Sequence, residues 1–409
     1  MTAHAEFQAA IAVRDVTPDP LLPVSGGTGG SEATTATKGR LNVRALVLAD
    51  DDTTIAICSA DYLGFPAALC NKVRVKVKGI PAENIIIGAT HTHSAPDPYC
   101  FPNPDGTSNC DMGYLDEVCD QLADAINEAA GALQPVSLKI ATGDAQGKIA
   151  YNYYAPQLYD PRCDVIQAIA ADGKPLATLV NYAIHPEVIG AGRGITSPDL
   201  IGPLYSRIEE QGGGTAIFMN GAQGGMVTAD VRRDDGNGEN NTWEECQRIG
   251  NLLADEALRI VKDAPVQDAP DLLCEARTVE FPVTSPLLKA IIEASPMLKD
   301  NPTQSSDLLS TQVNVVNVGN AQILTIPGEA LPNIGYYLKR NMHGEHNLLF
   351  GLTNDAFGYI LTKVDFDSFR RYDYISRTSL GEMTGEIYIE EALKFVDSVP
   401  RPAKLEAAK

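Results

Sequence analysis

The chain has 409 residues, 44% of them hydrophobic, and carries 32 basic against 53 acidic side chains, a net charge of −21. This length allows a large apolar core, and the acidity argues against binding to nucleic acid or to an anionic membrane, since both need clustered Lys and Arg. No run of about 18 apolar residues occurs, so we expect no membrane insertion.

Short apolar segments alternate with helical patterns along the whole chain. The predicted strands are residues 11–13, 43–48, 54–59, 84–89, 136–141, 165–170, 176–184, 215–219, 312–316, 322–326 and 347–352. The predicted helices are residues 115–132, 199–211, 242–262, 285–298, 331–341 and 383–396. Such alternation is typical of an α/β fold in which helices flank a mixed or mainly parallel sheet. We expect one domain over residues 1–409, and the Pro-containing segment 263–271 is either an internal subdivision or a surface crossing.

The most informative segment lies where the predicted strand 84–89 ends. His91 and His93 follow it at a spacing of two, which puts both side chains on one face beyond the strand's carboxyl end. The predicted strand 176–184 also ends in a histidine, His185. Neutral imidazole is the commonest metal ligand and suits zinc. The pattern favours a zinc centre, although spacing alone leaves open that these are hydrogen-bonded core histidines.

The eight cysteines include no C-x-x-C pair, which excludes a structural zinc ribbon. Cys100 and Cys110 flank a polar loop, and they form a disulfide in an oxidising compartment or stay free in a reducing cytosol. The first residues lack the basic and apolar regions of a signal peptide. We therefore expect a cytoplasmic protein, while a secreted or periplasmic protein whose leader has been removed would look the same.

Several separated segments resemble the neutral (non-lysosomal) ceramidase family in the family's own order. Residues 89–96, Ala-Thr-His-Thr-His-Ser-Ala-Pro, are similar to its Thr-His-Thr-His-Ser-Gly-Pro signature. Residues 181–186 resemble its second histidine segment, and residues 220–225 its Asn-Gly-Ala-x-Gly-Asp turn. Residues 327–329 and 351–359 resemble the C-terminal part of the catalytic domain. The resemblance implies that family's catalytic fold and a metal-dependent hydrolase.

The resemblance also implies one zinc ion per chain, held by His91, His185, Glu329 and Tyr359. Two imidazoles and one carboxylate are in any case a reasonable catalytic zinc shell, which leaves a position for water or substrate. Taken alone, Glu329 would be a carboxylate at a helix N-terminus, and Tyr359 a core residue. Zinc would acidify a bound water molecule and polarise the substrate carbonyl.

Further roles follow for residues around this metal site. His93 shares a strand face with His91 and is placed to exchange a proton with the tetrahedral intermediate. Tyr372 matches a family tyrosine expected to donate to the oxyanion. Asp61 and Asp199 are candidates to orient the imidazoles, with helix or turn capping as an equal alternative.

The chain departs from the family at the expected nucleophile. The family has a serine where this chain has Val227, and Thr228 follows. Attack by metal-activated water is therefore the better hypothesis, and Thr228 would contribute a hydroxyl to the pocket wall.

Two further departures concern the substrate. The family has an arginine after the asparagine that corresponds to Asn152, and this chain has Tyr153 there, which predicts a changed substrate. We take Asn152, Tyr153 and Asp199 as substrate-binding residues. The chain also ends without the family's C-terminal β-sandwich, so we expect a small, soluble substrate.

The leading hypothesis is a zinc-dependent hydrolase that cleaves an amide, ester or lactone in a small soluble molecule. The alternatives are a metal-dependent lyase or isomerase on the same fold, a ceramide amidohydrolase proper, and a binding protein without activity. The expected partner is a small molecule, nucleic acid is not expected, and a homo-oligomer is left open.

Overall fold

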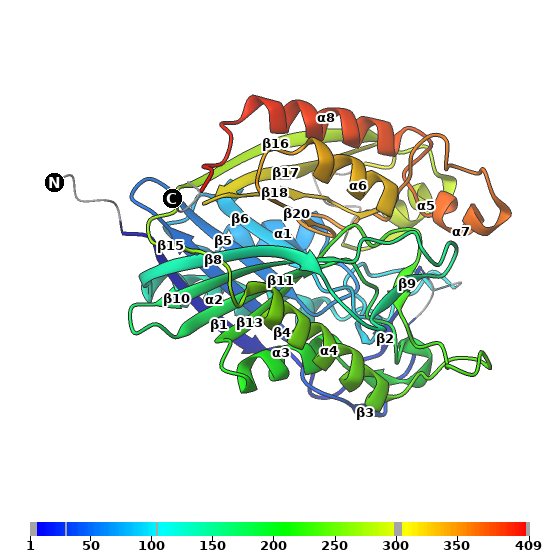
Figure 1. The fold of residues 1–409 in the computed structure, drawn as a ribbon. Helices are drawn as coiled ribbons and strands as arrows, with labels where there is room; N and C mark the ends of the chain where they lie inside the picture. Colours follow the sequence, from blue (N-terminus) through cyan, green and yellow to red (C-terminus); the bar gives the residue numbers. More distant parts are fainter. Residues whose placement is uncertain (1–5, 29–30, 104, 298–304, 406–409) are drawn as a thin grey trace.

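Figure 1 shows the computed structural model, which describes residues 6–28, 31–103, 105–297 and 305–405. Two β-sheets lie one on the other and share an apolar core, and helices cover their outer faces. The predicted mixed α/β class is confirmed. The first five residues, on which the signal-peptide prediction mainly rests, lie outside the described residues.

The larger sheet has nine strands in the order β13-β11-β10-β8-β1-β4-β5-β6, with β15 beside β8. Its strands are β1 (Gln8–Asp15), β4 (Asn42–Ala49), β5 (Thr54–Ala60), β6 (Ile85–Ala89), β8 (Gln134–Asp144), β10 (Arg162–Ala170), β11 (Pro175–Tyr182), β13 (Thr215–Asn220) and β15 (Val266–Gln267). Neighbouring strands are antiparallel except for the pairs at the two ends, β5/β6 and β11/β13, which are parallel. Most of these strands are apolar on both faces because both faces are buried.

The larger sheet curls until its two ends meet. A twist of about 20–25° between neighbours accumulates over the sheet and brings β13 beside β4, β5 and β6. Side chains bridge the seam: Ser59 Oγ donates to the Phe218 carbonyl at 2.6 Å, and Arg44 Nη1 donates to the Ala216 carbonyl at 2.7 Å. The carboxyl ends of β6 and β11 therefore lie close together.

The smaller sheet has the order β16-β17-β18-β20. Its strands are β16 (Leu272–Pro282), β17 (Leu308–Val318), β18 (Ala321–Thr325) and β20 (His346–Phe350), of which β18 and β20 are parallel. The segment 263–271 contains β15 and then crosses from the larger sheet into β16. One apolar cluster, which includes Ile57, Leu179, Ile323 and Phe350, fills the space between the two sheets.

Eight α-helices are present in the described residues: α1 (Ala67–Arg74), α2 (Met112–Gly131), α3 (Ile201–Glu210), α4 (Trp243–Val261), α5 (Pro286–Ala294), α6 (Pro332–Asn341), α7 (Asp373–Arg377) and α8 (Thr384–Ser398). The six predicted helices are confirmed, while α1 and α7 were not predicted. Thr242 caps α4 and Ser285 caps α5, each accepting a backbone N–H with its hydroxyl. The predicted helix 285–298 ends at Ala294 instead, and residue 298 lies outside the described residues.

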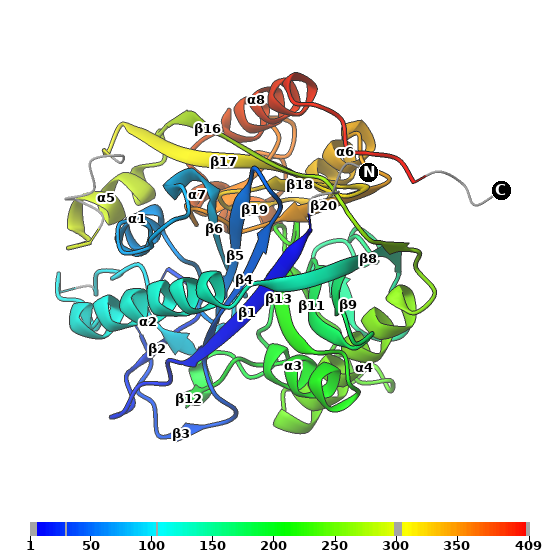
Figure 2. The ribbon, with the colours of Figure 1, turned by 90° about the vertical axis from the view of Figure 1, so that its left-hand side faces the viewer.

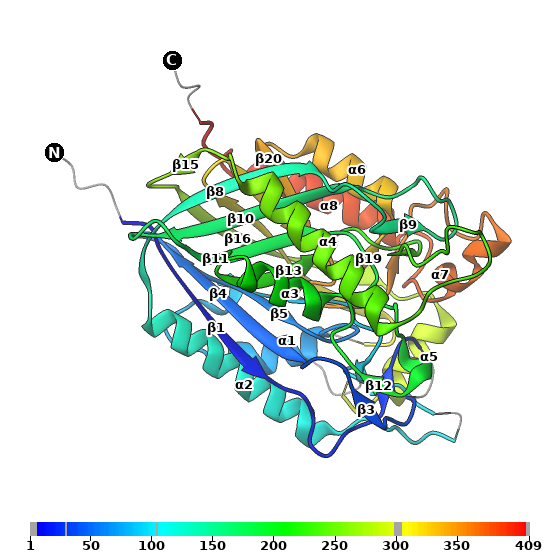
Figure 3. The ribbon, with the colours of Figure 1, turned by 60° about the horizontal axis from the view of Figure 1, so that its bottom comes forward.

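The helices divide between the two sheets. Figure 3 shows α3 and α4 in front of the larger sheet, and Figure 2 shows α2 along β1 and β4. Helices α6 and α8 lie on the smaller sheet (Figure 1). In the described part of the chain, no helix combines the length and the apolar character that crossing a membrane requires.

Short strands complete the structure around the meeting point of the sheets. They are β2 (Val24–Ser25), β3 (Ala36–Thr37), β7 (Ala95–Pro96), β9 (Ala150–Asn152), β12 (Ile195–Thr196), β14 (Val227–Ala229), β19 (Glu329–Ala330) and β21 (Tyr359–Ile360). Cys100 and Cys110 are joined by a disulfide, one of the two states that the sequence left open. Such a bond is typical of oxidising compartments, and the cytoplasmic location stays a prediction.

Candidate metal centre

Three side chains that follow three strand ends converge at the seam of the larger sheet. His91 follows β6, His185 follows β11, and Glu329 follows β18. Glu329 Oε2 lies 3.2 Å from His185 Nε2 and 3.5 Å from His91 Nε2. The His91 and His185 rings are 4.5 Å apart between centroids. The structure thus brings together three of the four residues that the sequence resemblance named as metal ligands.

Backbone carbonyls fix the direction of both imidazoles. Nδ1 of His91 lies 2.6 Å from the Leu63 carbonyl, and Nδ1 of His185 lies 2.8 Å from the Val227 carbonyl. A carbonyl only accepts, so each Nδ1 carries a proton, and in a neutral ring the lone pair is on Nε2. Nε2 of each ring therefore faces Glu329. His91 itself has a φ of 74°, a strained conformation for a residue other than glycine.

The two aspartates expected to orient the imidazoles bind backbone N–H groups instead. Asp61 accepts from the Asn42 N–H at 2.8 Å. Asp199 accepts from the N–H groups of Ile189 and Leu200, each at 2.8 Å. Burial raises the pKa of Asp61 to about 7 and that of Asp199 to about 6. Asp199 therefore holds the turn that follows His185, in line with the capping alternative, whereas Asp61 ties the end of β5 to the start of β4.

His93 and Tyr359 also contact residues of the centre. Nε2 of His93 lies 3.3 Å from Nε2 of His91, and Nδ1 lies 3.5 Å from Glu187 Oε2. The three histidines offer nitrogen atoms within 4.8 Å of one another. The Tyr359 hydroxyl contacts the Glu329 carboxylate and donates to Met226 Sδ at 3.5 Å. Glu329 and Tyr359 are also paired residues of the short β19–β21 ladder.

The electrostatics of the centre suit a cation. Burial lowers the pKa of His91 and of His93 to about 3, so both rings are neutral at ordinary pH. Burial also opposes charge on Glu329, but His91 and His185 outweigh it and hold the pKa of this carboxyl below its usual value. For His185, burial is outweighed by Glu329 and Glu187, which raise its pKa. The centre therefore combines a carboxylate with imidazole nitrogens.

Two buried polar atoms at the centre lack an aligned hydrogen-bond partner among the described residues, His185 Nε2 and Glu329 Oε2. An ion held at 2.0–2.2 Å in tetrahedral geometry places its ligand atoms about 3.3–3.6 Å apart. The separations of 3.2 and 3.5 Å from Glu329 agree with that spacing. The donor set therefore fits a divalent metal such as zinc.

A cavity opens from the centre. His91, His93, Glu329 and Tyr359 lie in its wall. Much of the remaining lining is apolar and includes Phe101, Leu288, Ile291, Ile292, Phe357 and Leu380. No Lys or Arg is among the described residues that line it. The helix α5 supplies three of these apolar side chains, so residues distant in sequence form the wall.

The three residues predicted to bind substrate, Asn152, Tyr153 and Asp199, and the predicted wall residue Thr228 are absent from the lining of this cavity. Thr228 and Tyr153 line a separate hollow, together with Glu187 and Met226. The Asn152 side chain is buried and bound within its own turn, accepting from the N–H groups of residues 154 and 155 and donating to the carbonyl of residue 158. Asn152 therefore shapes the loop that carries Tyr153.

The tyrosine that lines the cavity is Tyr374, two residues after the predicted Tyr372. The Tyr372 ring packs 5.5 Å from the Tyr154 ring and is absent from the lining. Tyr374 lies 5.9 Å from the Tyr359 ring and hydrogen-bonds Thr28. The sequence named Tyr372 alone, and the structure places Tyr374 at the cavity in its stead.

Gly26 and Gly27 also line the cavity, although neither was predicted to belong to the site. A Cβ on Gly26 would lie 3.2 Å from the His93 Cβ. Such a close approach of backbone to side chain is a reason for glycine at this position, and the glycine-rich composition was the available signal.

Fold and site together define an α/β protein with a buried His/Glu centre at the end of an apolar cavity. The fold is that of neutral ceramidases: the crystal structure of neutral ceramidase from Pseudomonas aeruginosa is similar with a TM-score of 0.77 and 16% identity, over 99% of this chain and 76% of that chain. A structure described as ceramidase complexed with C2 is similar with a TM-score of 0.78 and 17% identity, over 99% and 77% of the two chains. No protein-family profile and no curated protein matches the chain. The fold implied by the sequence resemblance is confirmed.

Proposed function

We propose that the protein is a metal-dependent hydrolase that cleaves a carbonyl–nitrogen or carbonyl–oxygen bond, with an amide as the first choice. The observation that carries this proposal is the buried centre, in which His185 Nε2 and Glu329 Oε2 lack an aligned hydrogen-bond partner among the described residues and the neutral His91 ring lies 3.5 Å from the same carboxylate oxygen. Unsatisfied buried polar atoms are costly and call for an explanation, and a bound divalent ion supplies one.

His91, His185 and Glu329 would hold the metal, and Tyr359 would complete the set or hold Glu329 in place. A zinc ion bound there supplies an acidified water molecule and polarises the substrate carbonyl. His93 presents Nε2 to the same point and is placed to exchange a proton with the reacting groups. Tyr374, at the cavity wall, is placed to donate to the substrate carbonyl, the role that the family resemblance implied for Tyr372.

Water, rather than a side-chain hydroxyl, is the proposed nucleophile. Val227 stands where the family has its serine, and its side chain is buried in the cluster beneath α3 and α4. Its carbonyl holds His185 in place. Thr228 lines the separate hollow. The segment that contains Val227 and Thr228 therefore contributes to the centre through its backbone and not through a side-chain hydroxyl.

The cavity favours a substrate with an apolar group. Its largely apolar lining and its lack of basic side chains suit an acyl or alkyl chain better than a charged group. This revises the expectation of a small, soluble substrate and favours an N-acyl lipid such as ceramide over a short lactone.

The test is hydrolysis by the purified, zinc-loaded protein of N-acyl amines with acetyl, octanoyl and palmitoyl chains, run in isotopically labelled water. The proposal expects the label in the released carboxylic acid and a preference for the longer chains. A product formed without solvent oxygen would support the lyase or isomerase alternative. Zinc-loaded protein that is inert toward amides, esters and lactones would support a binding protein.

A further inference from the structure

Asn220, the last residue of β13, connects the two chain segments that carry the metal-candidate histidines. Its Nδ2 donates to the Thr90 carbonyl at 3.0 Å and to the Ile184 carbonyl at 2.7 Å. Thr90 immediately precedes His91, and Ile184 immediately precedes His185. One side chain therefore spans the gap between the two histidine segments.

The amide of Asn220 uses its hydrogen-bonding capacity in full. Besides the two donations, Oδ1 accepts from the Ile184 N–H at 3.1 Å and from the Gly221 N–H at 2.9 Å. The side chain is completely buried. Since its partners are carbonyls on one side and N–H groups on the other, only one orientation of the amide satisfies all four bonds.

The backbone carbonyl of Asn220 connects a third chain segment to the two histidine segments. It accepts from the Gly351 N–H at 2.8 Å and from Asn181 Nδ2 at 3.0 Å. Gly351 follows β20, and the chain then leads to Tyr359. The residue thus sits where the ends of β6, β11, β13 and β20 meet.

Hydrogen bonding within the sheet does not set the distance between the two histidine segments. The strands β6 and β13 are the two ends of the larger sheet and share no ladder. Beyond the histidines, backbone bonds join the two stretches of chain, from the His93 N–H to the Pro186 carbonyl at 3.1 Å and from the Ser197 N–H to the Ser94 carbonyl at 2.8 Å. On the strand side of the histidines, Asn220 makes the connection. The strained φ of His91 also needs surroundings that hold it in place.

We infer that Asn220 is a positioning residue of the metal centre: its amide sets the spacing and direction of His91 and His185. The purpose of this positioning rests on the proposed function, but the spacing of the His91 and His185 rings is a property of the metal-free protein. Groups that orient metal ligands without touching the metal change its affinity by about 10- to 100-fold when they are removed.

The test is Asn220→Asp, which keeps the size of the side chain and the acceptor at Oδ1 but removes both donations. We expect its affinity for zinc, measured by competition with a chelator, to fall by about 10- to 100-fold. The added negative charge would by itself strengthen cation binding, so a fall identifies the loss of positioning.

The matched control is Asn314→Asp in β17 of the smaller sheet. Asn314 is equally buried, donates to the Glu83 carbonyl at 2.9 Å and accepts from Asn354 Nδ2 at 2.8 Å. We expect this variant to lose stability and to keep its zinc affinity. An equal loss of affinity in both variants would show general loosening and would overturn the inference.

A second readout needs no metal. In a crystal structure of metal-free Asn220→Asp, the separation of the His91 and His185 rings should differ from 4.5 Å, while Asn314→Asp keeps it. Unchanged spacing together with unchanged zinc affinity would overturn the inference. Wild-type protein that binds no zinc would instead refute the proposed function, and the ring separation would still test Asn220.

If the Asn220→Asp variant does not fold, the rates of amide hydrogen exchange in the wild-type protein test the inference. The N–H groups of Ile184 and Gly221, which Asn220 Oδ1 accepts, should exchange as slowly as those of the central strands. Exchange at the rate of an exposed loop would show that the connection opens freely and would contradict a positioning role.

Discussion

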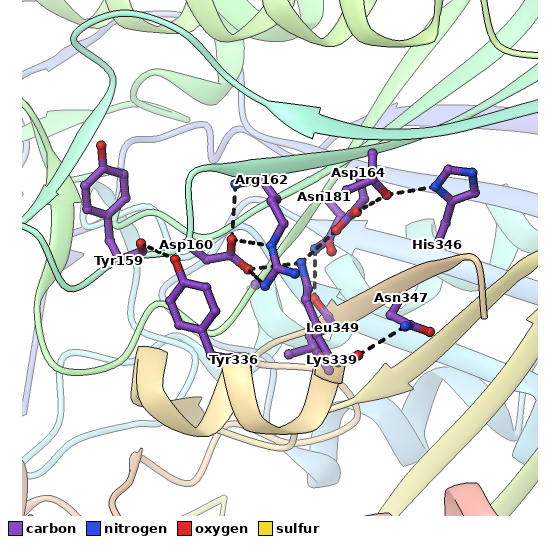
Figure 4. A network of polar contacts seen from close by, with 12 residues as sticks. Tyr159, Asp160, Arg162, Asp164, Asn181, Tyr336, Lys339, His346, Asn347 and Leu349 are labelled. Carbon is purple, nitrogen blue, oxygen red and sulfur yellow. Dashed lines mark hydrogen bonds and ion pairs between the residues drawn. The ribbon is translucent and has the colours of Figure 1, made fainter. Parts of the chain in front are cut away.

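Two buried polar clusters in this protein differ in how their charges are satisfied. The first is the metal-candidate centre. The second, here called the lysine network, consists of Asp160, Arg162, Asp164 and Lys339 (Figure 4). Lys339 Nζ lies 2.8 Å from Asp164 and 3.2 Å from Asp160, and Arg162 binds both oxygens of Asp160 at 2.7 and 2.8 Å. In the lysine network each charge has an opposite charge beside it.

The comparison separates a structural cluster from a functional one. The lysine network joins β10 and its preceding loop to α6, so it fastens the larger sheet to the helical layer of the smaller one. The centre, in contrast, leaves His185 Nε2 and Glu329 Oε2 without aligned partners. Damage to the lysine network should therefore lower stability and spare metal binding, whereas damage to the centre should abolish metal binding.

The largest effect is expected at the centre. His185→Ala and His91→Ala each remove a ligand, so zinc affinity and kcat/KM should fall by more than about 100-fold, beyond the range found for groups that only orient ligands. Metal content of the purified variants and their turnover of an N-acyl amine check this. Either variant with full zinc occupancy would remove that histidine from the metal shell.

A large loss of stability is expected in the lysine network. Lys339→Met leaves Asp160 and Asp164 buried without their shared cation, which should lower the free energy of unfolding by about 3–5 kcal/mol. Urea denaturation of metal-free protein measures this, and zinc affinity of the folded variant should equal that of the wild type. A loss of zinc affinity would show that the two clusters are coupled.

A smaller effect is expected from a change in the apolar wall of the cavity. This wall belongs to the metal-candidate centre and not to the lysine network. Ile292→Asn removes apolar contact worth about 1.5–3 kcal/mol, so kcat/KM for a palmitoyl amide should fall by about 10- to 100-fold relative to an acetyl amide. Leu287→Asn is the control, since Leu287 lies on the same helix, is 38% exposed and does not line the cavity. An unchanged ratio in Ile292→Asn would place the acyl chain elsewhere.

The smallest effect concerns the pH dependence of the lysine network. Burial opposes charge on Asp160, but Lys339 and Arg162 outweigh it and hold the pKa of this carboxyl below its usual value. The ionised Asp160 therefore stabilises the fold fully above its unfolded pKa of about 3.9, and this contribution is lost as the pH falls through that value toward the lower folded pKa. The difference in unfolding free energy between wild type and Asp160→Asn should shrink over this range. A constant difference would contradict the expected titration.

The sequence predicted those parts of the fold and site that depend on local pattern. Buried strands such as β6 and β11 were recognisable because both of their faces are apolar, and their ends located His91 and His185. The strand β16 was missed although polar side chains such as Glu275 and Arg277 alternate with less polar ones, because the prediction rested on continuous apolar runs. The short helix α1 was missed because it is too brief to show a helical period.

What the sequence could not predict depends on backbone direction and distant contacts. The partners of His91 and His185 are the carbonyls of Leu63 and Val227, and a backbone carbonyl leaves no trace in residue type. Whether Tyr372 or Tyr374 faces the cavity depends on the path of the short helix α7. The apolar cavity is built from segments as far apart as Phe101 and Leu380, whose meeting only the folded chain reveals.

The metal-candidate centre lies at the seam where the two ends of the larger sheet meet, and this location affects when the centre forms during folding. The side chains of the centre come from positions 91, 185 and 329, so no early fragment of the growing chain contains them together. Contacts of such long sequence separation are slow to form. Metal uptake by the nascent protein would thus mark the end of folding, and bound metal would report that both sheets have reached their final places.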